Sequence, residues 1–158
     1  MQIGFDYIGV GVCAVCHDGK GRVLLNLRSE NCRDEWHKWD NCGGAMRLGE
    51  SGEECVRREL REEYGCRPIK CQYGGIIEMK RQNGEKMNHW LILAYLVQID
   101  SKEAKNNEPH KFEQVKWFER HDLPQNRHSF FDQDWAAVQD EWNKFYSSHS
   151  SMDRTAAS

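Results

Sequence analysis

Hydrophobic and polar residues alternate in blocks along the N-terminal part of the chain, and these blocks predict strands. Residues 8–17 and 22–29 are rich in Val and Leu, which favour extended structure. The sequence DGKG at 18–21 separates the two runs, and its glycines can adopt the positive φ angles of a tight turn. The first 29 residues therefore predict a β-hairpin.

The middle of the chain repeats this pattern. Residues 71–79 and 87–99 predict two further strands joined by a turn at the Asn-Gly pair of 83–84. The second run, MNHWLILAYLVQI, is apolar enough to be buried on both faces, as in a central strand. A shorter strand is predicted at 115–118, and the polar segment 30–42 predicts a loop.

A helix with clear boundaries is predicted at 52–64. Ser51 is a favourable N-cap, and Glu54 follows three residues later, so the two can form a capping box. Gly65 suits the left-handed residue that ends a helix.

The last predicted helix covers residues 130–146. Its large apolar residues share one face, because they are spaced by four, three, four and three positions: Phe131, Trp135, Val138, Trp142 and Phe145. This stripe predicts a packing face rather than a ligand site. The small polar residues of 148–158 predict a disordered tail, so we expect one domain at 1–147.

Composition indicates a globular protein, with 39% hydrophobic and 30% charged residues in 158. A net charge of −3 gives no basic field to attract nucleic acid polymers or an anionic membrane. No stretch approaches the roughly 20 apolar residues of a membrane span, and the N-terminus lacks signal-peptide features. We therefore expect a cytoplasmic protein with a small-molecule partner, and a homodimer stays open.

Seven cysteines also favour a reducing compartment, because an odd number without signs of secretion predicts free thiols. Cys13 and Cys16 form a C-x-x-C pair that could suggest zinc. However, residues three apart on a strand point to opposite faces, so packing is the better interpretation.

The most informative feature is a group of three carboxylates. Glu59, Glu62 and Glu63 fall at i, i+3 and i+4 of the predicted helix, so they project from one face. Such like charges repel, and hard oxygen ligands are what Mg²⁺ or Mn²⁺ prefers. Spacing alone leaves a solvated acidic face as the alternative.

The flanking residues extend this group into a longer motif. Gly44 precedes Glu50 by six positions, and Arg58-Glu59-Leu60 is followed by Glu62-Glu63 and then by Gly65. This segment resembles the Nudix box, G-x5-E-x7-R-E-U-x-E-E-x-G-U, where U is a bulky aliphatic residue. Every fixed Gly, Glu and Arg is present, although Cys66 at the last U lacks the usual bulk.

The resemblance implies an α/β fold, the Nudix α/β/α sandwich with a mixed central sheet. It also implies an enzyme that hydrolyses a diphosphate linkage in a nucleotide with Mg²⁺ or Mn²⁺ as cofactor. The implied metal ligands are Glu59, Glu63 and the carbonyl of Gly43, while Glu62 is a ligand or the general base. Arg58 is expected to orient a box carboxylate, and the alternative for it is a surface ion pair with Glu62.

One further carboxylate is expected from the segment before residues 115–118. Glu113 is slightly favoured over Glu108, and either could instead be a solvated charge. The run EPHKFEQVKWFERHDLP resembles the corresponding region of MutT-like enzymes that cleave nucleoside triphosphates. Release of pyrophosphate from a triphosphate is therefore the favoured reaction.

The substrate is less well specified. The alternatives are a nucleotide sugar or another NDP-linked metabolite and, in a different class, a non-catalytic nucleotide-sensing module. Arg28 belongs to an incomplete coenzyme A motif, and aromatic and amide side chains could contact a base. The candidate substrate-binding residues are Arg28, Trp39, Asn41, Trp117 and Phe118, with Phe130, Asp40 and Asn126 as weaker candidates.

Overall fold

The structure is a computed structural model that describes the backbone of residues 1–155 and the side chains of residues 1–150. Its centre is a seven-stranded sheet. The strands are β1 (Gly9–His17), β2 (Arg22–Arg28), β3 (Trp39–Asp40), β4 (Cys42–Ala45), β5 (Pro68–Asn83), β6 (Lys86–Ile99) and β7 (Phe112–Glu119). The hairpin of β1 and β2 and the long pair of β5 and β6 confirm the predicted strands, and β7 is longer than expected.

The sheet is mixed. Its main path runs β3-β2-β1-β6-β5, with β4 beside β1 and β7 beside β2. The pair of β1 and β6 is parallel, and the other pairs are antiparallel. β1 uses one edge for two partners, because its residues 11–14 pair with β4 and its residues 16–17 pair with β2. β2 and β4 therefore diverge from a common neighbour.

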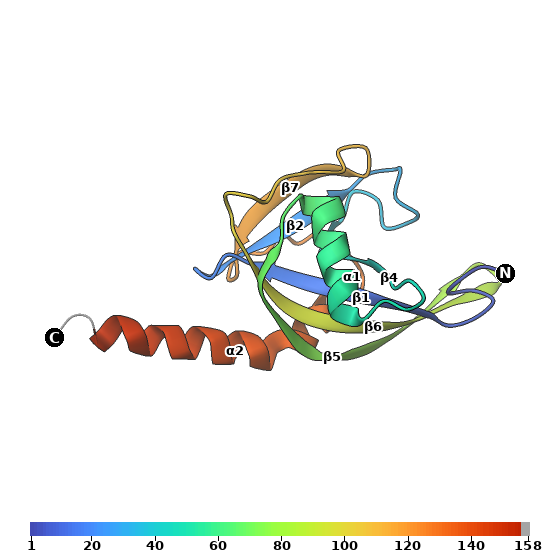
Figure 1. Cartoon of the computed structure of the whole chain (residues 1–158). Helices are drawn as coiled ribbons and strands as arrows, with labels where there is room; N and C mark the ends of the chain where they lie inside the picture. Colours follow the sequence, from blue (N-terminus) through green and yellow to red (C-terminus); the bar gives the residue numbers. More distant parts are fainter. Residues whose placement is uncertain (156–158) are drawn as a thin grey trace.

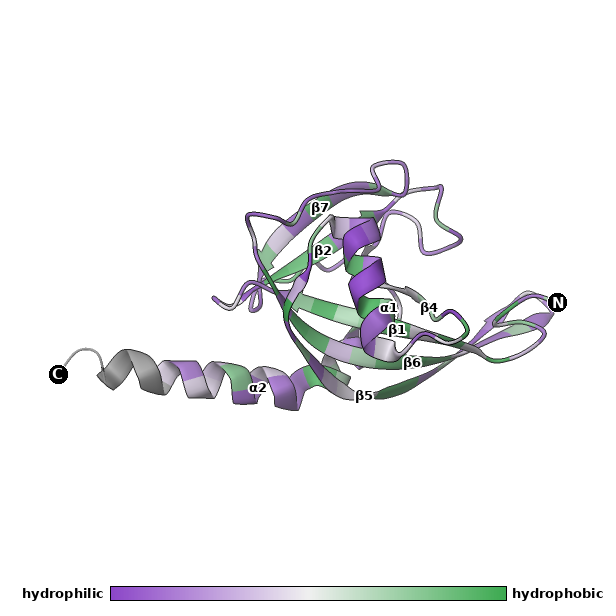
Figure 2. Cartoon of the chain, in the orientation of Figure 1, coloured by the Kyte–Doolittle hydropathy of each residue, from purple (hydrophilic) through white to green (hydrophobic). Residues whose placement is uncertain are grey.

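Two helical layers cover the two faces of this sheet (Figure 1). On one side lie α1 (Gly52–Glu59) and the π turn η1 (Leu60–Tyr64), and on the other lies α2 (Phe131–Thr155). Each layer closes its own hydrophobic core. Figure 2 shows apolar strands in the middle of the molecule and a mostly hydrophilic outer surface on α1. The layered α/β sandwich confirms the predicted fold class.

Local signals in the sequence set the ends of α1 and η1. Ser51 and Glu54 form the predicted capping box, and Gly65 ends η1 with a left-handed φ of 64°. The predicted helix 52–64 is thus present, but its last five residues form a π turn. A π turn contains one residue more per turn than an α-helix and is frequent at functional sites.

Two regions differ from the predictions. The segment 30–42, predicted as a loop, contains β3 and leads directly into β4. α2 continues to Thr155, so part of the predicted disordered tail 148–158 is helical, while residues 156–158 lie outside the described residues. The end of α2 extends beyond the sheet (Figure 1).

Within the described chain, no helix is both long and apolar enough to cross a membrane.

The cysteines have the packing role that was predicted. Cys13 lies in the core on the α2 side and Cys16 in the core on the α1 side, so the pair does point to opposite faces. All seven cysteines are free thiols.

Candidate active site

The three predicted carboxylates lie at the end of α1 and in η1. Glu59 is the last residue of α1, whereas Glu62 and Glu63 belong to the π turn. Glu59 and Glu63 are buried, but the side chain of Glu62 is 38% exposed. The group therefore has two members inside the molecule and one at the rim.

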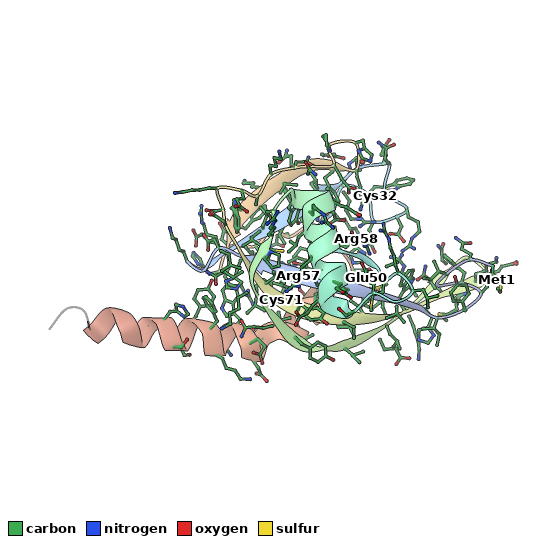
Figure 3. The ribbon with its side chains drawn as sticks, viewed as in Figure 1. Met1, Cys32, Glu50, Arg57, Arg58 and Cys71 are labelled. Atoms are coloured by element: carbon green, nitrogen blue, oxygen red, sulfur yellow. The ribbon has the colours of Figure 1, made fainter. Side chains whose placement is uncertain are left out.

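Arg58 holds the carboxylates of this region in place. Its buried guanidinium donates to Glu50 Oε1 at 2.7 Å, to Glu59 Oε1 at 2.5 Å and to Glu62 Oε2 at 3.3 Å. The same group donates to the carbonyl of Ala45 at 2.9 Å. The bond with Arg58 lowers the pKa of Glu50 to about 2. Arg58 lies on α1 close to Glu50 (Figure 3) and is no simple surface pair.

Lys111 neutralises the most deeply buried carboxylate. Its Nζ lies 2.8 Å from Glu63 Oε1 and 3.3 Å from Glu108 Oε2. The other oxygen of Glu63 accepts a hydrogen bond from the backbone N–H of Gly43 at 3.3 Å. Burial nevertheless raises the pKa of Glu63 to about 7, against the opposing effect of Lys111.

Two glycines of β4 lie where a side chain would not fit. A Cβ added to Gly44 would lie 2.2 Å from Glu59 Oε1. A Cβ added to Gly43 would lie 2.3 Å from the backbone oxygen of Val12 on β1. Neither position can accept a side chain without a shift of its neighbours. The lack of a side chain at Gly44 lets Glu59 lie against the backbone of β4, and the N–H of Gly43 contacts Glu63.

The chemistry of these side chains suits a divalent cation. Glu59, Glu62 and Glu63 supply hard carboxylate oxygens. Burial raises the pKa of Glu59, and the charge of Glu62 adds to this effect. Among the described residues, no three acidic, His or Cys side chains already converge as a metal cage. Arg58 and Lys111 currently supply the compensating positive charge. The three glutamates and the Gly43 carbonyl are the groups that could hold a metal.

A cavity of about 280 Å³ adjoins the carboxylate of Glu63. It lies where β2 and β4 diverge from β1, and its walls also include residues of β6, the segment before β7 and the start of α2. Glu63, Lys111 and Gly43 line it together with Asn41 and Asp134. The aromatic lining consists of Trp90, Phe112, His128 and Phe130.

Asn41 and Asp134 form a buried polar pair in the wall of this cavity. Asn41 Nδ2 donates to Asp134 Oδ2 at 3.2 Å. Asn41 Oδ1 is buried and has no hydrogen-bond partner within the described residues. Burial, assisted by the charge of Asp40, raises the pKa of Asp134 to about 8. At neutral pH this carboxyl is largely protonated and can donate a hydrogen bond.

The predicted substrate-binding residues fall into two sets. Arg28 and Asn41 line the cavity, as does the weaker candidate Asp40. Trp39, Trp117 and Phe118 do not: Trp39 and Phe118 pack edge to face at 4.8 Å beside the α2-side core, and Trp117 packs against the α1-side core. Successive residues of β7 point to opposite faces, and both faces are covered. Asn126 instead donates to the backbone of His37.

The two candidates for an additional acidic ligand are also separated. Glu113 pairs with His37 at 2.5 Å and raises the pKa of that imidazole. Glu108 contacts Lys111, which in turn contacts Glu63. Glu108 therefore lies near the box carboxylates, linked to Glu63 through Lys111. Glu113 instead pairs with His37, in the segment 30–38.

Asp134 and Lys111 are charged residues of the site that had no role assigned from the sequence. Asp134 carried a usable signal, because it lies three positions after Phe131 and hence on the apolar face of the predicted helix. A charged residue at such a position indicates a special environment. Lys111 lies in an irregular segment whose geometry has no periodic signature, so its contact with Glu63 needed the structure.

Comparison with known proteins agrees with this geometry. The NUDIX domain family model matches residues 8–139, which is most of the chain. A MutT Nudix hydrolase from Burkholderia pseudomallei is 27% identical, with a TM-score of 0.74 over 84% of this chain and 99% of that one.

Two more distant solved structures share the fold. The MutT protein of Methanosarcina mazei Go1 is 22% identical, with a TM-score of 0.70 over 85% of this chain and 94% of that one. The NUDIX domain of Shewanella oneidensis NrtR, solved with ADP-ribose, is 20% identical, with a TM-score of 0.68 over 87% and 90%.

Proposed function

The chain belongs to the Nudix family and is a Nudix pyrophosphohydrolase, and from this premise we propose that it converts a nucleoside triphosphate to the monophosphate and pyrophosphate. One observation carries the proposal: a single cavity is lined by Glu63 and Lys111 and by the Asn41–Asp134 pair. Lys111, and a cation held by Glu63, suit a phosphate chain, and the second pair suits the polar edge of a base. Small-molecule sites typically combine such convergent polar groups with aromatic walls.

We assign metal binding to Glu59, Glu63 and the carbonyl of Gly43, with Glu108 as the additional acid in place of Glu113. The contact of Lys111 with both Glu63 and Glu108 supports this choice. Bound Mg²⁺ or Mn²⁺ would neutralise phosphate charge and lower the pKa of a water molecule.

We assign Glu62 as the general base that accepts the proton of the attacking water. Glu59 and Glu63 lie buried against the backbone of β4, whereas Glu62 is at the rim and accessible to water. Its contacts with Arg58 and Arg47 fix its orientation without burying it. Arg58 acts through the carboxylates that it holds, so it is a positioning residue.

Lys111 and the base-binding pair complete the assignment. Lys111 lines the cavity and can contact a phosphate oxygen when Glu63 has another cation as its partner. Asn41 offers an unpaired acceptor, and protonated Asp134 offers a donor. Together they can form two hydrogen bonds with the edge of a nucleobase.

The test is hydrolysis by the purified protein with Mg²⁺ of a panel of nucleoside triphosphates, with separation of monophosphate and pyrophosphate. Glu62→Gln should lower kcat by about 100-fold or more, because general base catalysis contributes about 10²–10⁴. Glu53→Gln is the matched control, since Glu53 is exposed on α1 and pairs with Arg57. A Glu62→Gln variant with activity within twofold of the parent would show that Glu62 is not the general base.

Two other functions belong in the same experiment. The NrtR domain holds ADP-ribose, so ADP-ribose and nucleotide sugars should be included as NDP-linked substrates. Binding of a nucleotide without turnover of any compound would favour the sensing module. We also propose the cytoplasm as the location, because the seven free thiols suit a reducing compartment.

A further inference from the structure

A second pocket lies apart from the cavity described above. Its volume is about 480 Å³, and it lies between the segment after β7 and the first turns of α2. Its polar and aromatic lining residues are Arg120, His121, Arg127, Phe131, Asp132, Trp135 and Gln139. None of its lining residues lines the active-site cavity.

Two guanidinium groups lie over aromatic rings in this pocket. Arg120 is 4.0 Å from the ring centroid of Trp135, and Arg127 is 5.3 Å from that of Phe131. Contact with a ring face helps to hold a guanidinium in place. The pocket therefore holds two positive charges close together.

The positive charge of this pocket is poorly compensated. Within the described part of the chain, Arg120 has no ion pair with a carboxylate, and its polar contact is Gln139 Oε1 at 3.5 Å. Burial and the nearby charge of Arg127 lower the pKa of Arg120. Arg127 donates to the carbonyl of Pro124 at 3.1 Å and pairs with Asp132 at 3.1 Å, but that carboxylate is 79% exposed and can turn away into solvent.

Trp135 lies under Arg120 in the wall of this pocket and can report on it. Trp135 is 4% exposed, and its indole N–H is buried without a hydrogen-bond partner in the described structure. This N–H is therefore no direct contact for a ligand, but its signal depends on the charge and position of the groups packed on the ring.

We propose that this pocket is a second anion site that binds a phosphate group between Arg120 and Arg127. A phosphate has several acceptor oxygens, which match the fork geometry of guanidinium groups. Its negative charge would also remove the repulsion between the two arginines. Free phosphate, pyrophosphate and a phosphate ester share this chemistry.

The test follows the indole N–H signals of the protein by NMR during titration with inorganic phosphate at constant ionic strength. Trp135→Phe identifies the signal of Trp135, and the other five tryptophans serve as internal references. We expect a saturable shift of the Trp135 signal. Parallel titrations with pyrophosphate and a nucleoside monophosphate, without divalent metal, show which source binds most tightly.

Variants separate this site from a general effect of charge. Arg120→Gln should weaken phosphate binding about tenfold or more, as expected for loss of a charge-assisted hydrogen bond. Arg22→Gln is the matched control, since Arg22 also stacks on a tryptophan, Trp117, but is ion-paired with Asp18. Arg127→Gln should also weaken binding, and both variants should keep hydrolysis within twofold.

Two results would overturn the proposal. The first is a Trp135 signal that does not move with any of the three anions. The second is an equal response in the parent, Arg120→Gln and Arg127→Gln proteins, with unchanged reference signals showing that the variants are folded.

Discussion

At the scale of single residues, the site depends on buried charges that have partners. Glu63 is buried with Lys111 beside it, and Glu59 is buried with Arg58 beside it. Desolvation of a charge is costly, and removal of one member of a buried pair leaves the other uncompensated. These pairs therefore make the metal-free protein sensitive to substitutions that leave its backbone unchanged.

Lys111→Met should destabilise the metal-free protein by about 1–3 kcal/mol at pH 8, below the usual 3–5 for buried pairs because Lys111 is 34% exposed. The loss should be smaller at pH 5, where Glu63, with a pKa of about 7, is protonated. Chemical unfolding at both pH values measures this difference. Lys144→Met, at an exposed pair with Glu141, is the control, and equal losses in both variants would contradict the argument.

Asp134→Asn tests the protonated carboxyl. In the parent, ionisation of Asp134 above about pH 8 removes its donor, so KM for the substrate should rise there. The amide keeps a donor at every pH, so the variant should lack this rise. Steady-state kinetics between pH 6 and 9.5 measures KM, and an identical alkaline rise in both proteins would exclude Asp134 as its cause.

At the scale of elements, β4 is the part of the sheet that shapes the site. Its Gly43 and Gly44 bring the backbone against Glu59 and Glu63. β4 exists because residues 11–14 of β1 have an edge that β2 does not use. The position of the carboxylates thus depends on a strand of four residues.

Gly44→Ala should lower kcat/KM by about 100-fold, because its Cβ would displace the carboxylate of Glu59 and misplacement of this size commonly has such an effect. Gly75→Ala on β5 is the matched control, since its Cβ would meet its nearest neighbours at 3.8 and 4.0 Å. Steady-state kinetics of both variants measures kcat/KM. Equal activities would show that the close approach of Gly44 is not required.

The elements that could be predicted are those with local causes. Ser51, Glu54 and Gly65 specify the ends of their helix through contacts with near neighbours in sequence. In contrast, Gly-rich β4 has no strand propensity of its own and forms by pairing with β1, about 30 residues earlier. The spacing of Asp134 from Phe131 indicates the inward face, but its pairing with Asn41 depends on the tertiary fold. Sequence therefore identified the carboxylates but not the cavity beside them.

At the scale of the whole molecule, α2 is joined to the sheet through a buried histidine. His17 of β1 accepts at Nδ1 from the Gly19 N–H at 3.3 Å and lies 2.8 Å from the hydroxyl of Tyr146. Rings of Trp142 and Phe145 surround it. Burial lowers the pKa of His17 to about 4, so the folded protein keeps it neutral.

Stability should therefore fall as the pH decreases from about 6.5 to 4. In this window the unfolded chain binds a proton at His17 that the folded protein excludes, and folding is penalised. Thermal unfolding of the parent and of His17→Gln across this range measures the effect. The variant should show a shallower dependence on pH, and equal slopes would assign the acid sensitivity to other groups.

The π turn η1 has a consequence for how the box can change in length. A π turn is a one-residue shift of helical phase, placed between Glu59 and Gly65. Because the π turn already holds one residue more than an α-helical turn, deletion of one residue there can close it to an α-helical turn with little rotation of the flanking chain. Insertion of one more residue has no such outlet and would rotate the preceding helix by about 100° relative to the following chain. Glu59 could then not face Gly44 while Glu63 faced Gly43. An insertion in η1 should therefore be as damaging as the loss of a glutamate.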